Sequence, residues 1–258
     1  MEEYVIMKMQ IRTGMFETNS SSAHSLLIMK KRQTMTQQEI RDEYYLDEDW
    51  HKDNVLRLDL YDNEYGRSFN VLTSFRDKLS YALASMYGNC YKLKNYIEAG
   101  NKFEEVCVPL LKKLVGVDEV EMSMDNRCFN VYSDTITDDE YQDYDTYEEV
   151  PYDDLVYNED CEYSATYKET CKSGRKQERI WLDVPDFGGV DHQSSDLFQG
   201  FLKKYGLALE EYLIRKDIVV VTDGDESCIF GIMMDSGLID KDAIQIIYSS
   251  LSSYNKRI

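Results

Sequence analysis

The sequence lacks several features that would assign it to a common class. None of its 258 residues fall in an apolar run long enough to span a membrane, and the start, Met1-Glu2-Glu3-Tyr4, has no signal-peptide character. Its six cysteines include no C-x-x-C pair and lie in no Cys/His cluster, which argues against a zinc site and a disulfide framework. We therefore expect a cytoplasmic protein with no membrane partner.

Positive charge is also scarce. The chain has 29 Lys and Arg against 49 Asp and Glu, a formal charge of −20, and its basic residues occur only in short groups. Nucleic-acid binders normally carry a clustered basic face, so direct binding to duplex nucleic acid is not expected. A negative field of this size instead favours encounter with a basic protein, which is therefore one expected partner.

Much of the acidity is local. Residues 134–162 contain 13 acidic residues and no Lys or Arg, and removing those 13 negative charges from −20 leaves −7. Five tyrosines are interspersed in this run, which we interpret as an acidic, partly ordered insertion within one domain of residues 1–258. Two interpretations of its role stay open. It is either a solvated charge run or a surface that mimics nucleic acid and occupies a basic groove.

Hydrophobic spacing predicts strands at both ends of the chain and helices between them. Residues 8–16, 25–29, 54–60, 218–222 and 243–248 have strand character, whereas residues 37–45, 74–88, 194–206, 209–215 and 227–234 have helical character. Asn101 and Glu104 resemble a capping box and predict a further helix that begins at Asn101. These elements predict an α+β fold: a mixed sheet formed by the N- and C-terminal strands, with helices packed on it.

One dense motif lies near the start of the chain, Gly14-Met15-Phe16-Glu17-Thr18-Asn19-Ser20-Ser21-Ser22-Ala23-His24-Ser25. It resembles the opening of a family of uncharacterised bacteriophage and prophage proteins, which begin with a short strand followed by G-x-F-E-T-N-S-S-S-x-H-S. A later segment, Val190-Asp191-His192-Gln193-Ser194, is similar to a D-H-Q/E-S element of the same proteins. Ala23 departs from the Thr or Ser expected there. The resemblance implies a phage origin and no particular activity.

The residue types of the first motif suit anion binding. A tight loop containing Asn19, Ser20, Ser21 and Ser22 presents hydroxyls, an amide and backbone N–H groups to a phosphate or carboxylate. His24 follows at the start of a strand, where it can act as an acid, a base or a metal ligand. The alternative is that these side chains only satisfy the backbone of a turn.

The second element places Asp191 and His192 just before a predicted helix start at Ser194, a position that favours anions. Helix capping by Asp191 and Ser194, with a solvated His192, is the structural alternative. If both motifs reach the same sheet edge, the two histidines and Asp191 form one pocket. Such a set can bind a divalent metal, or perform acid/base chemistry on a nucleotide or other phosphate ligand.

These observations leave three hypotheses for the function. The first is a phage accessory protein, acting in host takeover or counter-defence, with a phosphate- or metal-binding pocket that can be hydrolytic. The second is a non-catalytic inhibitor that mimics nucleic acid, and the third is a virion or assembly component. The chain has no G-x-S-x-G motif, so no serine is singled out as a nucleophile. The run Asp223-Gly224-Asp225-Glu226 can ligate a cation, although a turn is the favoured interpretation.

Overall fold

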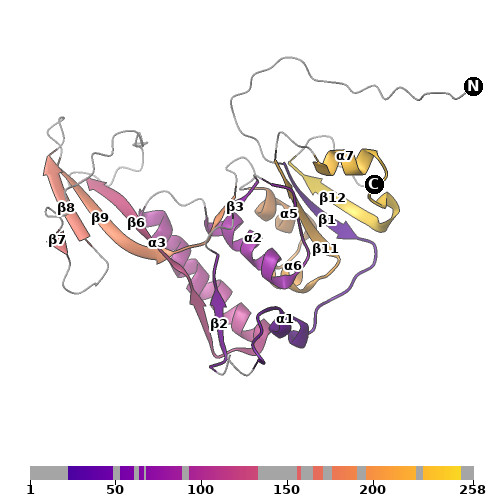
Figure 1. Ribbon diagram of the computed structural model, residues 1–258, viewed down its shortest axis with the longest axis horizontal. Coiled ribbons are helices and arrows are strands. Elements are labelled where there is room, and N and C mark those ends of the chain that lie inside the picture. The colour runs from indigo at the N-terminus through magenta and orange to yellow at the C-terminus, as the bar shows by residue number, and fades with distance from the viewer. Residues whose placement is uncertain are drawn as a thin grey trace, which may run out of the picture.

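The computed structural model of the chain is shown in Figure 1. It describes residues 23–48, 53–60, 64–66, 68–88, 93–132, 156–157, 165–170, 176–190, 196–224 and 229–250. The predicted strand at residues 8–16 and the acidic run, except for Val156 and Tyr157, therefore lie outside the described residues.

The main sheet joins strands from both ends of the sequence, as predicted. Its strands are β1 (Ala23–Met29), β4 (Asn70–Leu72), β11 (Ile218–Asp223) and β12 (Ile244–Ser249), in the order β12-β1-β11-β4. All three neighbouring pairs are antiparallel. Parallel pairing occurs in two small sheets, β2 (Val55–Leu58) with β5 (Glu119–Met122), and β3 (Glu64–Tyr65) with β10 (Gly189–Val190). The α+β fold class is confirmed.

Helices cover both faces of this sheet (Figure 1). Three of them, α2 (Phe75–Tyr87), α5 (Leu197–Tyr205) and α6 (Leu209–Ile214), share the larger hydrophobic core with Leu26 and Ile28 of β1. On the opposite face, α7 (Ile229–Asp235) forms a smaller core with Leu27. Because side chains alternate along a strand, even-numbered residues of β1 face α2 and Leu27 faces α7.

Helix α2 lies at the centre of the larger core and is buried along nearly its whole length. Its start is capped twice: the Ser74 hydroxyl accepts a hydrogen bond from the Asp77 N–H at 3.0 Å, and the Glu43 carboxylate accepts from two further amides. Glu43 ends α1 (Gln37–Glu43), so this cap also fixes α1 against α2. Gly88 ends α2, as predicted from the sequence.

The prediction of a helix start at Asn101 was wrong. Helix α3 (Leu93–Lys102) already contains Asn101 and continues through a π-helical stretch (Phe103–Cys107), α4 (Val108–Leu111) and a second π-helical stretch (Lys112–Gly116). Pro109 cannot donate a backbone hydrogen bond, and the irregular stretches on either side of it accommodate that loss. The helix ends at Gly116, which has a positive φ of 74°.

A second four-stranded sheet was not predicted. It has the order β6-β9-β8-β7, from β6 (Met124–Tyr132), β9 (Lys176–Pro185), β8 (Ala165–Thr170) and β7 (Val156–Tyr157). In Figure 1 its strands form an arm that extends away from the main sheet. Strand β6 ends at Tyr132, just before the acidic run, and β7 lies within the run, so the described residues beside and within it belong to the arm.

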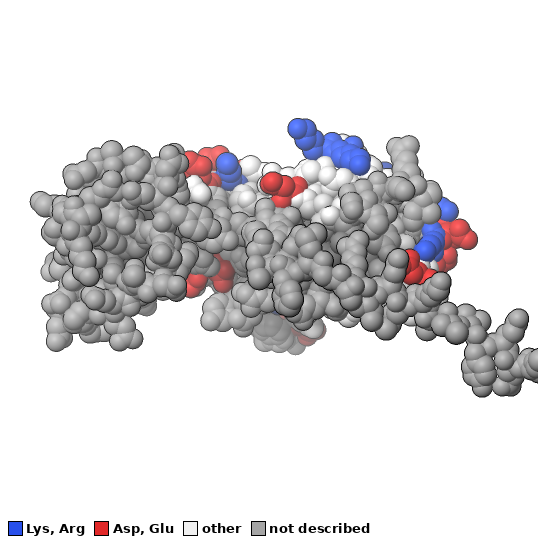
Figure 2. Space-filling view, turned by 90° about the horizontal axis from the view of Figure 1, so that it is seen from above, with Lys and Arg blue, Asp and Glu red and all other residues white. Residues whose placement is uncertain are grey.

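Described charges of both signs are interspersed on the face seen in Figure 2. Several form exposed ion pairs that link distant segments: Arg32 with Glu211, Lys113 with Glu210, and Lys216 with Glu39. Such exposed pairs contribute little individually to stability.

Candidate functional site

His24 lies at the N-terminal end of β1, between two neighbouring strands. It is opposite Thr222 of β11, and its backbone N–H donates to the Ser250 hydroxyl at 3.0 Å. Because His24 is an even-numbered residue of β1, its imidazole points to the face of the sheet that α2 covers, where the side chain is completely buried. A fully buried histidine is held in one orientation by its surroundings, which is a requirement for a positioned acid, base or ligand.

The imidazole contacts one residue of the central helix. His24 Nδ1 and the Tyr81 hydroxyl lie 3.0 Å apart in the buried interior, a hydrogen bond whose donor depends on the histidine tautomer. Burial raises the pKa of the Tyr81 phenol well above its ordinary value, so the phenol keeps its proton at neutral pH. Tyr81 therefore sets the orientation of the His24 ring, a role that second partners of functional histidines commonly have.

The described residues on either side of the second motif also lie around Tyr81, which binds His24 of the first motif. Its ring lies 5.3 Å from that of Tyr65 and 6.0 Å from that of Phe198. Tyr65 pairs with Val190, the last described residue before Asp191, and Phe198 belongs to the first turn of α5, just after the motif. Segments about 170 residues apart in sequence thus meet around one side chain.

The approach of the chain to Val190 is fixed by close packing on α2. Gly88 lies so near the carbonyl of Gly188 that a Cβ at position 88 would collide with that backbone oxygen. Asp186 accepts a hydrogen bond from the Gly188 N–H at 2.9 Å, and Gly188 has a positive φ of 68°. Phe187 packs between the rings of Tyr87 and Phe103. These contacts position β10 beside β3, and the chain therefore passes near Tyr81.

Neutral polar groups continue the site across the sheet. The Thr222 hydroxyl, opposite His24, donates to the Ser68 carbonyl at 3.2 Å and accepts from the Asn70 amide at 3.4 Å. Thr222 is completely buried. This row of a hydroxyl, an amide and an imidazole offers hydrogen bonds without adding net charge.

The opposite face of the same sheet end is polar as well, but its groups serve the fold. The hydroxyls of Ser25 and Ser249 lie 2.8 Å apart, and the Asp223 carboxylate accepts from the Phe230 N–H at 2.8 Å. Asp223 thus holds the start of α7. Asp225 and Glu226 of the run 223–226 lie outside the described residues. Among the described residues, no group of three or more His, Cys, Asp or Glu side chains could hold a metal ion.

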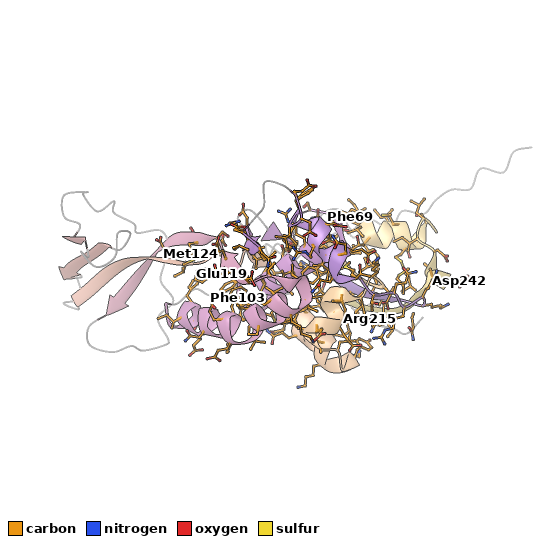
Figure 3. The ribbon with its side chains drawn as sticks, turned by 90° about the horizontal axis from the view of Figure 1, so that it is seen from below. Phe69, Phe103, Glu119, Met124, Arg215 and Asp242 are labelled. Carbon is orange, nitrogen blue, oxygen red and sulfur yellow. The ribbon has the colours of Figure 1, made fainter. Side chains whose placement is uncertain are left out.

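One helical turn before Tyr81, α2 carries a buried lysine. Lys78 donates from Nζ to the backbone carbonyls of Tyr212 at 3.1 Å and Arg215 at 2.7 Å, at the end of α6. Burial lowers the pKa of Lys78 to about 8. Arg215, labelled in Figure 3, forms a buried ion pair with Asp217 at 2.5 Å. These contacts join α2, α6 and β11 about one turn of α2 away from Tyr81.

The predicted site residues divide into two groups. The structure places His24 in a buried hydrogen bond with Tyr81, a partner that the sequence did not indicate. The remaining predicted residues lie outside the described residues: Asn19, Ser20, Ser21, Ser22, Asp191, His192 and Ser194. Ser22 is separated from His24 by one residue, and Asp191 directly follows Val190, so the described neighbours of both groups belong to the surroundings of Tyr81.

Comparisons with protein-family models, curated proteins and solved structures gave no match to this chain. Within the described part of the chain, no helix has the length and apolar character needed to cross a membrane.

Proposed function

We propose that this chain is a phage accessory protein, acting in host takeover or counter-defence, whose site around His24 binds a phosphate-bearing ligand or metal. The phage assignment is supported by the resemblance of residues 14–25 to the phage and prophage family. In this proposal the loop of Asn19, Ser20, Ser21 and Ser22 holds the anion together with the Ser194 hydroxyl. Helix α5 begins at Leu197, three residues after Ser194, and not at Ser194 as predicted. His24 and His192 serve as acid and base or as metal ligands, and Asp191 orients an imidazole.

The observation that carries the proposal is the contact of both motifs' flanks with Tyr81. The His24 imidazole bonds its hydroxyl, while Tyr65, paired with Val190, and Phe198 pack on its ring. The described flanks of the second motif, Val190 and Phe198, therefore support a pocket shared with His24, which requires both histidines to lie near one another. Hydrolysis of the bound phosphate is the reaction that two imidazoles and a carboxylate can support.

The test is calorimetric titration of the full chain with pyrophosphate and with ATP, each with and without Mn²⁺. We expect binding by the wild type and at least a tenfold loss of affinity in the double variant His24→Ala/His192→Ala. The matched control is His51→Ala, the third histidine of the chain, which should bind like the wild type. Circular dichroism of all three proteins checks that the fold is retained. Equal binding affinities of the wild type and the double variant would rule out the proposal.

A second candidate function is supported by the arm. Strand β6 ends just before the acidic run and β7 lies within it, and both strands belong to a sheet that extends away from the main sheet (Figure 1). The run is strongly acidic in sequence, and such negative charge suits contact with a basic groove of a host protein. Replacing the Asp and Glu of residues 134–155 by Asn and Gln should abolish salt-sensitive capture of a purified basic DNA-binding protein. Unchanged capture by the neutralised variant would exclude this candidate.

A further inference from the structure

Exposed apolar side chains gather on one short stretch of the described chain. Among the described residues, three of the eight exposed large hydrophobic side chains lie within residues 229–238: Ile229, Ile232 and Leu238. Ile232 is 61% exposed and Leu238 is 74% exposed, whereas the other five are scattered singly along the sequence. Single exposed apolar residues need no explanation, but a group of them marks an interaction surface.

Two of these side chains lie on the outer face of α7. Phe230 and Met234 are buried in the core between α7 and the main sheet. Ile232 lies midway between them in sequence, so at about 3.6 residues per turn it points away from the sheet. Ile229 lies one turn before Ile232 and is exposed beside it. The outer face of a surface helix normally carries polar residues, so these two isoleucines are not explained by the core of this chain.

The end of α7 brings the third side chain to the same place. Gly237 has a positive φ of 74°, and the Leu238 N–H donates to the Met233 carbonyl at 3.1 Å. This turn folds Leu238 back against the last turn of the helix. We refer to Ile229, Ile232 and Leu238 as the α7 stripe.

The charges next to the α7 stripe are balanced. Three aspartates and three lysines are exposed in residues 235–242 and just after β1: Asp235, Asp240, Asp242, Lys30, Lys31 and Lys241. The two parts adjoin, because the Lys30 N–H donates to the Ala243 carbonyl at 2.9 Å. Within the described part of the chain none of these six forms an ion pair, unlike the exposed charges of Arg32, Lys113 and Lys216. Both signs are thus available here to a partner that also carries both.

The α7 stripe lies far from the arm. Figure 1 shows α7 at the end of the molecule opposite β6 to β9, and Asp242 in Figure 3 lies at this same end. A chain with a formal charge of −20 repels its own copies over most approaches. Two copies that meet through α7 keep their arms, and the strands beside the acidic run, at opposite ends. Repulsion between the arms is then screened, since the Debye length is only about 8 Å at physiological salt.

We propose that the α7 stripe is the contact between two copies of this chain, with the two α7 helices packed antiparallel across a twofold axis. In such an interface the same surface meets itself, so Ile232 contacts its counterpart near the axis, and Ile229 of each copy contacts Leu238 of the other. The lysines beside the stripe pair with aspartates of the second copy. The surface is small, so we expect a Kd of about 10 µM. The proposal uses no residue of the site around His24, so it stands or fails independently of the proposed function.

Sedimentation velocity of the full chain over a series of concentrations tests the dimer. We expect the wild type to dimerise and the variants Ile232→Asp and Leu238→Asp to have a Kd at least tenfold higher. The matched control is Val106→Asp, an equally apolar and exposed position on the π-helical stretch after α3, which should dimerise like the wild type. Because all three side chains are exposed, the variants should fold, and circular dichroism checks this. A wild type that stays monomeric well above the expected Kd, or equal dimerisation of all four proteins, would overturn the proposal.

Photo-crosslinking identifies the surface that meets the stripe. A benzophenone amino acid replaces Ile232 in the full chain, and the labelled protein is mixed with isotope-labelled wild type so that mass spectrometry distinguishes the two copies. We expect crosslinks between copies, to residues 229–238. Crosslinks within one copy would mean that another segment of the same chain covers the stripe, and crosslinks between copies at other residues would mean a different interface. Either result, or the absence of crosslinks, would contradict the proposal.

Discussion

Tyr81→Phe is the substitution that most directly probes the candidate site. It removes only the hydroxyl that lies 3.0 Å from His24 Nδ1, while the ring contacts with Tyr65 and Phe198 can persist. Because both partners are completely buried, water cannot replace the lost hydrogen bond. Deleting one partner of a buried hydrogen bond costs about 1–3 kcal/mol, and we expect the free energy of unfolding to fall by that amount. For a chain of this size each kcal/mol corresponds to a lower Tm of about 2–4 °C.

Urea denaturation of four proteins measures this effect: wild type, Tyr81→Phe, His24→Leu and the double variant. If the two side chains bond one another, their coupling free energy should be about 0.5–3 kcal/mol, and the double variant should lose less than the two single losses together. Tyr205→Phe is the matched control, since its ring packs on Phe201 and Tyr248 without a hydroxyl contact comparable to that of Tyr81. A loss below about 0.5 kcal/mol in Tyr81→Phe, or a coupling near zero, would refute the assigned role of Tyr81.

Two further predictions concern the helix that carries Tyr81. Because burial lowers the pKa of Lys78 from 10.5 to about 8, the unfolded chain binds more protons between these values. This lysine therefore makes the free energy of unfolding increase by about 2 kcal/mol from pH 8 to pH 10, and Lys78→Met should abolish the increase in urea titrations. A rise of equal size in both proteins would contradict this. Gly88→Ala should destabilise the fold by about 1–3 kcal/mol, because the new methyl group collides with the Gly188 carbonyl. Gly189→Ala meets only open space and should melt like the wild type in calorimetry; equal Tm values for the two variants would disprove the close-packing argument.

Much of the main sheet and its helices could be predicted because their signals are local. β1, β11 and β12 are short apolar runs bounded by turn residues, and α2 has a capping serine before it and a glycine after it. The meeting of the terminal strands could also be predicted, because no other long strand is recognisable in the sequence and a strand at each end then has few possible partners. The error at Asn101 has the same origin: a capping pattern is common in helix interiors, and only tertiary packing decides where a helix starts.

The second sheet could not be predicted from local patterns. Strands β6, β8 and β9 are rich in charged and polar residues, such as Arg127, Lys168 and Arg179, so they lack the apolar alternation by which a strand is recognised. β6 pairs along its whole length with β9, from Met124 opposite Pro185 to Tyr132 opposite Gln177. Pairing across more than 40 residues leaves no signal in either strand taken alone.

Tyr81 was missed for a related reason. The apolar stripe that predicts α2 consists of Phe75, Leu79 and Leu83, and Tyr81 lies off that stripe, where a solvent-exposed residue is expected. Helix α2 is instead buried on nearly all sides, between the sheet on one side and α5 and α6 on others, so residues off the stripe are internal too. A tyrosine and a lysine at such positions must find polar partners inside the protein, and His24 and the end of α6 provide them.

The placement of these partners explains why the surroundings of Tyr81 are the best candidate for chemistry. The core of this helix could have been made entirely of apolar side chains, at no cost in buried polar groups. It instead keeps a buried hydrogen bond between the His24 imidazole and the Tyr81 phenol at the end of the sheet. The close contact between Gly88 and Gly188 also brings residues 186–190 to this region. A fold gains little stability from such a pair, because each hydrogen bond only offsets the burial of its own groups. A site that must hold an imidazole in one orientation gains a great deal, since the second partner removes the rotational freedom of the ring before any ligand arrives.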